Sequence, residues 1–162
     1  MGLALDIIID GLQRNTDILK NHLSDLSDAD LLTRPCPGAN HAKWQLGHLL
    51  VAETHIIGLL GGQGAELPAH FKNAFTNDTA KSDDPAAFPS KAELLATLDT
   101  VRQATAAGIR NLKDEDLTKT GPNFPPFAPT YGLLASLFAS HAYMHVGQIQ
   151  VIRRKLGRPV LF

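Results

Sequence analysis

The sequence predicts an all-α protein, and within that class a four-helix bundle. Apolar residues recur at helical spacing in four long segments, residues typical of helix caps border these segments, and no stretch of useful length alternates as a strand would. Four such helices form a bundle by default. The 162 residues are enough to bury a substantial core, so we expect a single domain over residues 1–162.

The first helix is predicted over Leu3–Leu23, where leucine and isoleucine residues form one stripe. The following Ser27–Asp30 segment resembles a capping box and predicts a short turn. Asn40 is then a suitable N-cap for the second helix, which we expect to stop at Gly61 and Gly62.

A long connection rich in Pro, Asp and Asn separates the second helix from the third and extends to Pro89. Within it, Pro68–Phe75 is predicted to form a helical turn or two. Bundle helices are usually joined by two to eight residues, so this segment either crosses the bundle or carries function. A crossover would place the second and third helices parallel.

The third helix is predicted to begin at the S-x-x-E capping box of Ser90–Glu93. The Thr120–Pro129 segment holds four prolines and cannot be helix interior. Thr130 is predicted to cap the fourth helix, which we expect to end near Lys155, with Gly157 just beyond the end.

The composition excludes several classes of partner. A net charge of −1 and a pI near 6.6 provide no basic surface for nucleic acid or an anionic membrane. The single cysteine, Cys36, excludes an internal disulfide and a thiolate-rich zinc site. The uncharged 131–152 stretch is about long enough to span a membrane, but it contains two His, two Gln and two Ser. The start lacks a signal-peptide pattern, so we expect a soluble, cytoplasmic protein.

Two histidines stand four residues apart in that uncharged stretch. His141 and His145 leave the same face of the predicted helix, which is the spacing at which two imidazoles chelate one ion. No glutamate follows His141, so the zincin metalloprotease pattern is absent. Such a pair is also common as a structural feature, and without a metal these residues would be buried histidines that need hydrogen-bond partners.

A metal site needs a third ligand from another element. The second predicted helix carries His41, His48 and His55, whose spacing of seven separates neighbours by about 10 Å along the helix axis. At most one can therefore join the pair. His48 is the best candidate, because it lies mid-helix after Gly47, which allows another backbone to approach closely.

Several other residues have more than one interpretation. Gln148 shares the face of the histidine pair and either orients a ligand or bonds the backbone. Trp44 either walls a pocket or belongs to the core or an interface. His22 and His70 are predicted to be surface residues, and Arg153 is expected mainly to complement the helix C-terminus.

Two motifs carry a family resemblance. The segments WQLGHLL (Trp44–Leu50) and HAYMHVGQIQVIRRKLG (His141–Gly157) resemble the DinB superfamily, and RPCPGANHAKW (Arg34–Trp44) also fits its pattern. The resemblance implies a four-helix bundle with a crossover between the second and third helices. It also implies a three-histidine metal site and a homodimer.

Transferred to this chain, the family's metal ligands are His48, His141 and His145. The resemblance implies a divalent ion, with zinc or nickel as the main candidates. Some relatives are bacillithiol S-transferases or a mycothiol-dependent maleylpyruvate isomerase. The isomerase branch replaces one of the histidines by a carboxylate, which this chain does not, so that activity is less favoured.

The functional expectation is therefore a metal-dependent enzyme that activates a thiol or water nucleophile towards a small-molecule substrate. Thiol-dependent S-transfer, with a low-molecular-weight thiol as co-substrate, is the leading form. The alternatives are a metal-dependent hydrolase and a non-catalytic, metal-binding or stress-related dimeric module. Lys72, Lys81 and Arg102 are cations that an acidic thiol could meet.

Overall fold

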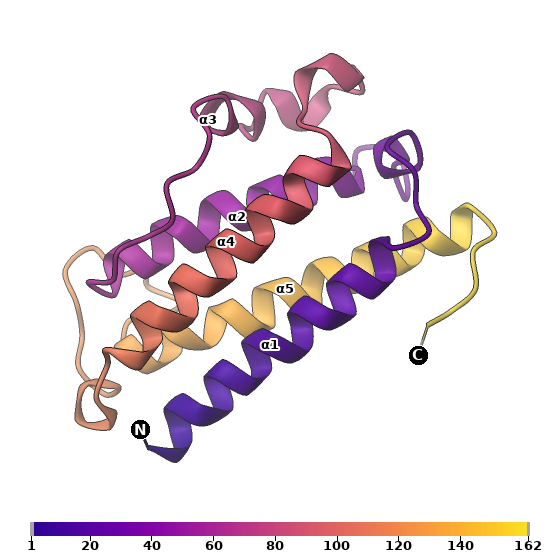
Figure 1. Cartoon of the computed structure of the whole chain (residues 1–162). Helices are drawn as coiled ribbons and strands as arrows, with labels where there is room; N and C mark the ends of the chain where they lie inside the picture. Colours follow the sequence, from indigo (N-terminus) through magenta and orange to yellow (C-terminus); the bar gives the residue numbers. More distant parts are fainter. Residues whose placement is uncertain (1, 162) are drawn as a thin grey trace.

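The computed structural model of the chain describes residues 2–161 and shows a bundle of four long helices (Figure 1). These are α1 (Leu3–Leu23), α2 (Ala42–Leu59), α4 (Lys91–Arg110) and α5 (Tyr131–Lys155). The connections contain the short α3 (Phe71–Ala74) and the 3₁₀ turns η1 (Asp30–Leu32), η2 (Thr79–Lys81), η3 (Pro85–Ala87) and η4 (Asp114–Asp116). The described residues contain no β-strand, so the all-α prediction is confirmed.

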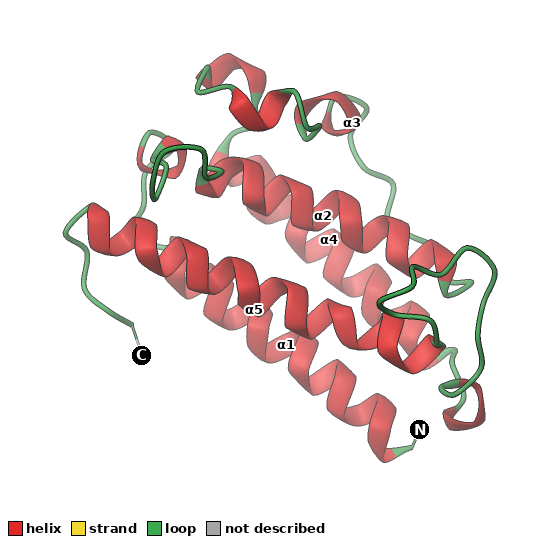
Figure 2. Cartoon of the chain, turned by 180° about the vertical axis from the view of Figure 1, so that it is seen from behind, coloured by secondary structure: helices red, strands yellow, loops and turns green. Residues whose placement is uncertain are grey.

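The helices are connected in an order that makes two parallel pairs. Figures 1 and 2 show that α1 and α5 run in one direction, while α2 and α4 run in the other. The connection carrying α3, η2 and η3 returns along the outside of the bundle before α4 begins. The predicted crossover is thus confirmed, and it makes α2 a neighbour of both α4 and α5.

The core consists of two apolar clusters separated by a polar layer. The cluster nearer the crossover includes Leu50, Leu98 and Val146, and the other includes Leu12, Ile57 and Phe138. Between them lie buried polar side chains at positions where the helix stripes would otherwise continue: Asn15, Glu53, Arg102 and Thr105. The apolar stripes of α1, α2 and α4 are therefore interrupted at about the same level, where α5 contributes the Phe138 carbonyl group.

Capping side chains begin three of the predicted elements as expected. The Ser90 hydroxyl accepts a hydrogen bond from the Glu93 amide at 3.2 Å, and the Thr130 hydroxyl accepts from the Leu133 amide at 3.3 Å. Ser27 and Asp30 form the reciprocal capping box. The left-handed Gly157, with φ of 69°, follows α5, so local sequence chemistry sets these helix ends.

The N-cap of α2 is His41, which corrects the prediction of Asn40. The His41 Nδ1 atom accepts a hydrogen bond from the Trp44 amide at 3.0 Å, and its Nε2 lies 3.2 Å from the Ser82 carbonyl oxygen. The imidazole can do both only as the neutral tautomer that carries its proton on Nε2. His41 is therefore buried because it caps a helix and also holds the crossover segment.

Two further expectations fail near the C-terminus of α5. Arg153 is 1% exposed, pairs with the Asp25 carboxylate and donates to the His22 carbonyl oxygen at 2.7 Å. His22 is also buried, and its Nδ1 lies 2.8 Å from the Ile18 carbonyl oxygen. His22 was predicted on the surface, and Arg153 was expected mainly to complement the helix C-terminus, but α5 packs along α1 and both residues are buried. His70 is exposed, as predicted.

Within residues 2–161, no helix is both long and apolar enough to cross a lipid bilayer. The uncharged segment of α5 carries buried residues on one face and exposed ones such as Ser136, Tyr143 and Gln148 on the other. The uncharged segment is therefore part of a bundle helix that has one buried side and one solvent-facing side.

We predict that His41 makes the metal-free protein lose stability in acid. Burial, followed by the nearby Arg34 charge, lowers the pKa of His41 from 6.5 to about 4. The unfolded chain therefore binds more protons between these pH values, so stability is complete above pH 6.5 and falls towards pH 4. His41→Asn should keep the cap and remove up to about 3 kcal/mol of this pH dependence.

The measurement is urea unfolding at several pH values in the presence of a chelator, with the exposed His70→Asn as the matched variant. Equal pH slopes for His41→Asn and the unchanged protein would show that the capping imidazole is not responsible.

Candidate metal centre

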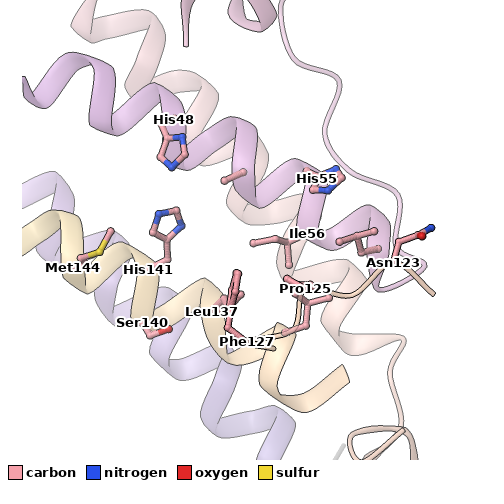
Figure 3. A pocket seen from close by; sticks show the side chains of 13 residues that line it. His48, His55, Ile56, Asn123, Pro125, Phe127, Leu137, Ser140, His141 and Met144 are labelled. Carbon is pink, nitrogen blue, oxygen red and sulfur yellow. The ribbon is translucent and has the colours of Figure 1, made fainter. Parts of the chain in front are cut away.

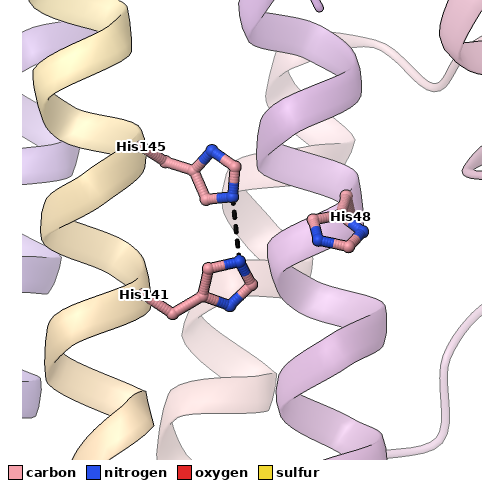
Figure 4. Close-up of side chains that lie close together, drawn as sticks. All are labelled: His48, His141 and His145. Atoms are coloured by element: carbon pink, nitrogen blue, oxygen red, sulfur yellow. Dashed lines mark hydrogen bonds between the residues drawn. The ribbon is translucent and has the colours of Figure 1, made fainter. Parts of the chain in front are cut away.

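Three imidazoles converge between α2 and α5 (Figure 4). His48 comes from α2, and His141 and His145 come from successive turns of α5. One candidate ligand atom from each residue lies within 4.8 Å of the others. The Nε2 atoms of His141 and His145 are 3.1 Å apart, and the His48 ring centre lies 5.4 and 5.8 Å from the centres of the other two rings. The structure therefore brings together the three residues that were predicted from the sequence.

The neighbourhood of His48 is fixed by two aromatic side chains. Trp44, one turn earlier on α2, stacks on the His48 ring with 4.8 Å between centres and 6° between planes. Gly47 meets the ring of Phe75, and a Cβ atom added at position 47 would lie 1.9 Å from the Phe75 Cζ atom. The close approach predicted at Gly47 is thus made by a crossover side chain and not by another backbone.

His145 is oriented by Gln148 on the next turn of α5. Its Nδ1 atom lies 2.8 Å from the Gln148 side-chain oxygen. An amide oxygen only accepts hydrogen bonds, so Nδ1 carries the proton and Nε2 presents its lone pair towards His141. Metal-binding histidines commonly use their second nitrogen in this way.

The electrostatic environment keeps the three rings neutral. Burial lowers the pKa of His145 to about 4, with a further contribution from His141. Burial also lowers the pKa of His48, and it lowers that of His141 together with the nearby His48 and Arg102. Neutral imidazole is the form that binds a metal, so these residues fit a divalent ion in both geometry and protonation.

The other sequence candidates lie outside this cluster. His41 caps α2, and His55 is exposed one to two turns beyond His48. Glu53, on the same helix, is buried against Arg102. His41 and His55 lie outside because residues seven apart share nearly one face of a helix but are separated by about 10 Å along its axis.

An apolar cavity of about 550 Å³ opens next to His48 and His141 (Figure 3). It lies between the second half of α2, the first half of α5 and the proline-rich loop before α5. Its wall includes Ile56, Leu59, Phe127, Leu134, Leu137 and Met144. Of the two loop aromatics, Phe127 lines the cavity, whereas Phe124 packs against Tyr131.

A second, more polar hollow of about 420 Å³ borders the other side of the cluster. His48 and Met144 line both hollows, while His145 and Gln148 line only this one. Its remaining wall comes from the 35–40 loop and the first turn of α2. The three imidazoles thus stand at the junction of an apolar cavity and a polar hollow, and sequence spacing alone gave no sign of either.

A buried ion pair lies behind the cluster. The Glu53 Oε2 atom is 3.1 Å from Arg102 Nη1, which also donates to the Phe138 carbonyl oxygen at 3.4 Å. Asn15 Nδ2 donates to the same carbonyl at 3.1 Å. Burial raises the pKa of Glu53, and the Arg102 charge opposes that rise. This network joins all four long helices one turn before His141.

A crossover bundle with three convergent imidazoles defines a class of four-helix proteins with a histidine cluster between the second and fourth long helices. A sequence profile described as the DinB superfamily matches residues 12–149, and the chain belongs to this family. No curated protein sequence matches the chain.

Three solved structures share the fold. A conserved protein from Enterococcus faecalis superposes with a TM-score of 0.72 and 20% identity, covering 98% of this chain and 99% of that one. YfiT from Bacillus subtilis is described as a probable metal-dependent hydrolase with an unusual four-helix bundle topology. It superposes with a TM-score of 0.68 and 20% identity, covering 98% of this chain and 91% of that one. A DinB-like protein from Bacillus cereus superposes with a TM-score of 0.70 and 17% identity, covering 96% of this chain and 95% of that one. At these identities, the similarity establishes the fold.

We predict that Glu53→Ala is strongly destabilising, because it leaves the Arg102 guanidinium buried without a counter-charge. The free energy of unfolding should fall by about 3–5 kcal/mol, as measured by urea denaturation. Replacing both partners, as in Glu53→Leu with Arg102→Met, should recover most of the loss.

The exposed Asp10–Arg14 pair provides the comparison, since Asp10→Ala removes an ion pair that lies in solvent. A Glu53→Ala protein as stable as Asp10→Ala would contradict a structural role for the buried pair.

Proposed function

We propose that His48, His141 and His145 bind one divalent ion, zinc or nickel, and that the chain is a metal-dependent hydrolase of small molecules. The observation that carries the proposal is the convergence of three neutral imidazoles, one buried and two half-buried, at the edge of a cavity. When bound to three protein ligands, such an ion retains open positions and activates a water or thiol nucleophile at neutral pH.

The chain's own residues prepare this site in three ways. Gln148 fixes the tautomer and orientation of His145, and Trp44 holds the plane of the His48 ring. The apolar wall around Leu137 limits water around a bound substrate, which strengthens electrostatic interactions there. The name of the Bacillus subtilis relative, a probable metal-dependent hydrolase, supports the choice of water as nucleophile.

Thiol-dependent S-transfer is the second candidate. The polar hollow beside His145 offers a separate approach for a co-substrate, and a further hollow that shares Gly38 and Asn40 with it reaches Lys81. Arg102 cannot serve this purpose, because it is engaged with Glu53 in the core. Arg34 is also occupied, since it bonds Asp83 and three backbone carbonyl groups.

We also propose a cytoplasmic homodimer, as the family resemblance implies. The outer face of α5 has no charged residue between Tyr131 and Ile152, and it exposes Leu133, Met144 and Val151 by about half of each. Gly147 on this face meets no atom within 4 Å, so nothing within the chain requires a glycine there. A second copy that approaches α5 closely would account for both features.

The metal proposal predicts about one divalent ion per chain in tag-free protein. His48→Ala and His145→Ala should each abolish it, because two remaining imidazoles form a weak site. Gln148→Ala should lower the affinity by about 10-fold or more through loss of ligand orientation. The measurement is inductively coupled plasma mass spectrometry, followed by zinc and nickel titration.

His70→Ala is the matched control, because that histidine is exposed and distant from the cluster in sequence. Protein that contains no metal and takes up neither zinc nor nickel would refute the site.

The hydrolase proposal predicts metal-dependent cleavage of activated esters or amides. Turnover should fall by about 100-fold or more in His145→Ala. It should not recover as long as the metal site stays empty. A rate that appears only when a low-molecular-weight thiol is added would instead establish S-transfer. An ion that binds tightly without either activity would leave the non-catalytic module as the function.

A further inference from the structure

The apolar cavity beside the histidines contains no charged group in its wall. Among the described residues that line it, none is Asp, Glu, Lys or Arg, and its polar groups are the histidines, Asn123 and Ser140. Its volume of about 550 Å³ lies in the range typical of small-molecule sites. A charged group placed inside would lose its hydration without gaining a partner, which is strongly unfavourable.

The cavity also has a defined direction. His48 and His141 stand at one end of it, while Phe127 and Asn123 from the proline-rich loop stand towards the other (Figure 3). Phe127 is 76% exposed, which is unusual for an aromatic ring, and Asn123 takes a left-handed conformation with φ of 62°. An apolar ligand that enters here would cover the Phe127 ring and bring one end to the imidazoles.

We infer that this cavity takes an uncharged apolar group, such as an aryl or acyl chain, and that this group is part of the substrate whose reactive atom lies at the His48–His141 end. That this ligand is a substrate rests on the proposed function, whereas the class of ligand follows from the cavity itself. It places any charged or strongly polar part of the reactants on the other side of the cluster, in the hollow lined by Gln148.

The test compares two fluorescent probes with the same aryl body. N-phenyl-1-naphthylamine is neutral, and 1-anilinonaphthalene-8-sulfonate adds one negative charge. Binding is measured in the unchanged protein and in His145→Ala, where the missing ligand removes the influence of a bound cation. In His145→Ala we expect one neutral probe per chain and an affinity for the anionic probe that is lower by about 10-fold or more.

Two serines on α5 provide matched variants. Ser140 lines the cavity, Ser136 lies one turn earlier outside it, and each hydroxyl bonds a carbonyl group of the preceding turn. Ser140→Trp should fill the cavity and weaken the neutral probe by about 10-fold or more, whereas Ser136→Trp should leave its affinity within about twofold. Ala52→Phe blocks the same cavity from α2 if Ser140→Trp does not fold.

Equal affinity for both probes in His145→Ala would overturn the inference. Unchanged binding of the neutral probe in the folded cavity-filling variants would overturn it as well. Neutral-probe binding that appears only when the protein is diluted would also overturn it, because a second copy would then occupy the cavity. A failure of the proposed function would be seen separately, as absent metal or absent hydrolysis while the probe still binds.

Discussion

The polar layer across the middle of the bundle is the constraint on which the rest of the structure depends. Glu53 and Arg102 are both almost fully buried, and neither could stay charged in the core without the other. Their contact, together with the bonds from Arg102 and Asn15 to the Phe138 carbonyl group, is made only when the four helices meet in one register. That register places His141, one turn beyond Phe138, opposite α2.

The crossover supplies the second constraint. Because it returns along the outside of the bundle, α2 runs parallel to α4 and lies beside α5, the helix with the histidine pair. The crossover is held against α2 at two points: the Phe75 ring covers Gly47, and the Ser82 carbonyl oxygen bonds the capping His41. The segment that sets the topology therefore also braces the turn that carries His48.

Burial connects this architecture to chemistry. The same packing that buries His145 and half-buries His48 and His141 lowers their pKa values and keeps them available as neutral ligands. The packing is incomplete around the cluster, where an apolar cavity and a polar hollow meet. A site with neutral ligands, an uncharged cavity on one side and amide groups on the other is suited to a substrate whose two ends differ in polarity.

The sequence alone determined the features that depend on neighbours along the chain. The helix spans, the caps at Ser90 and Thr130, and the one-turn spacing of His141 and His145 follow from local backbone chemistry and helical periodicity. The mid-helix position of His48 after Gly47 made it the best third ligand, and the family motifs indicated the same residue. Only the tertiary structure decided which side chains became buried, because burial depends on helices distant in sequence. His41 caps α2 in place of Asn40, and Arg153, expected mainly to complement the helix C-terminus, is buried in a pair with Asp25. The tertiary structure also decided the cavity, because its wall comes from α2, α5 and the loop before α5, and no single segment contains enough of it to predict a cavity.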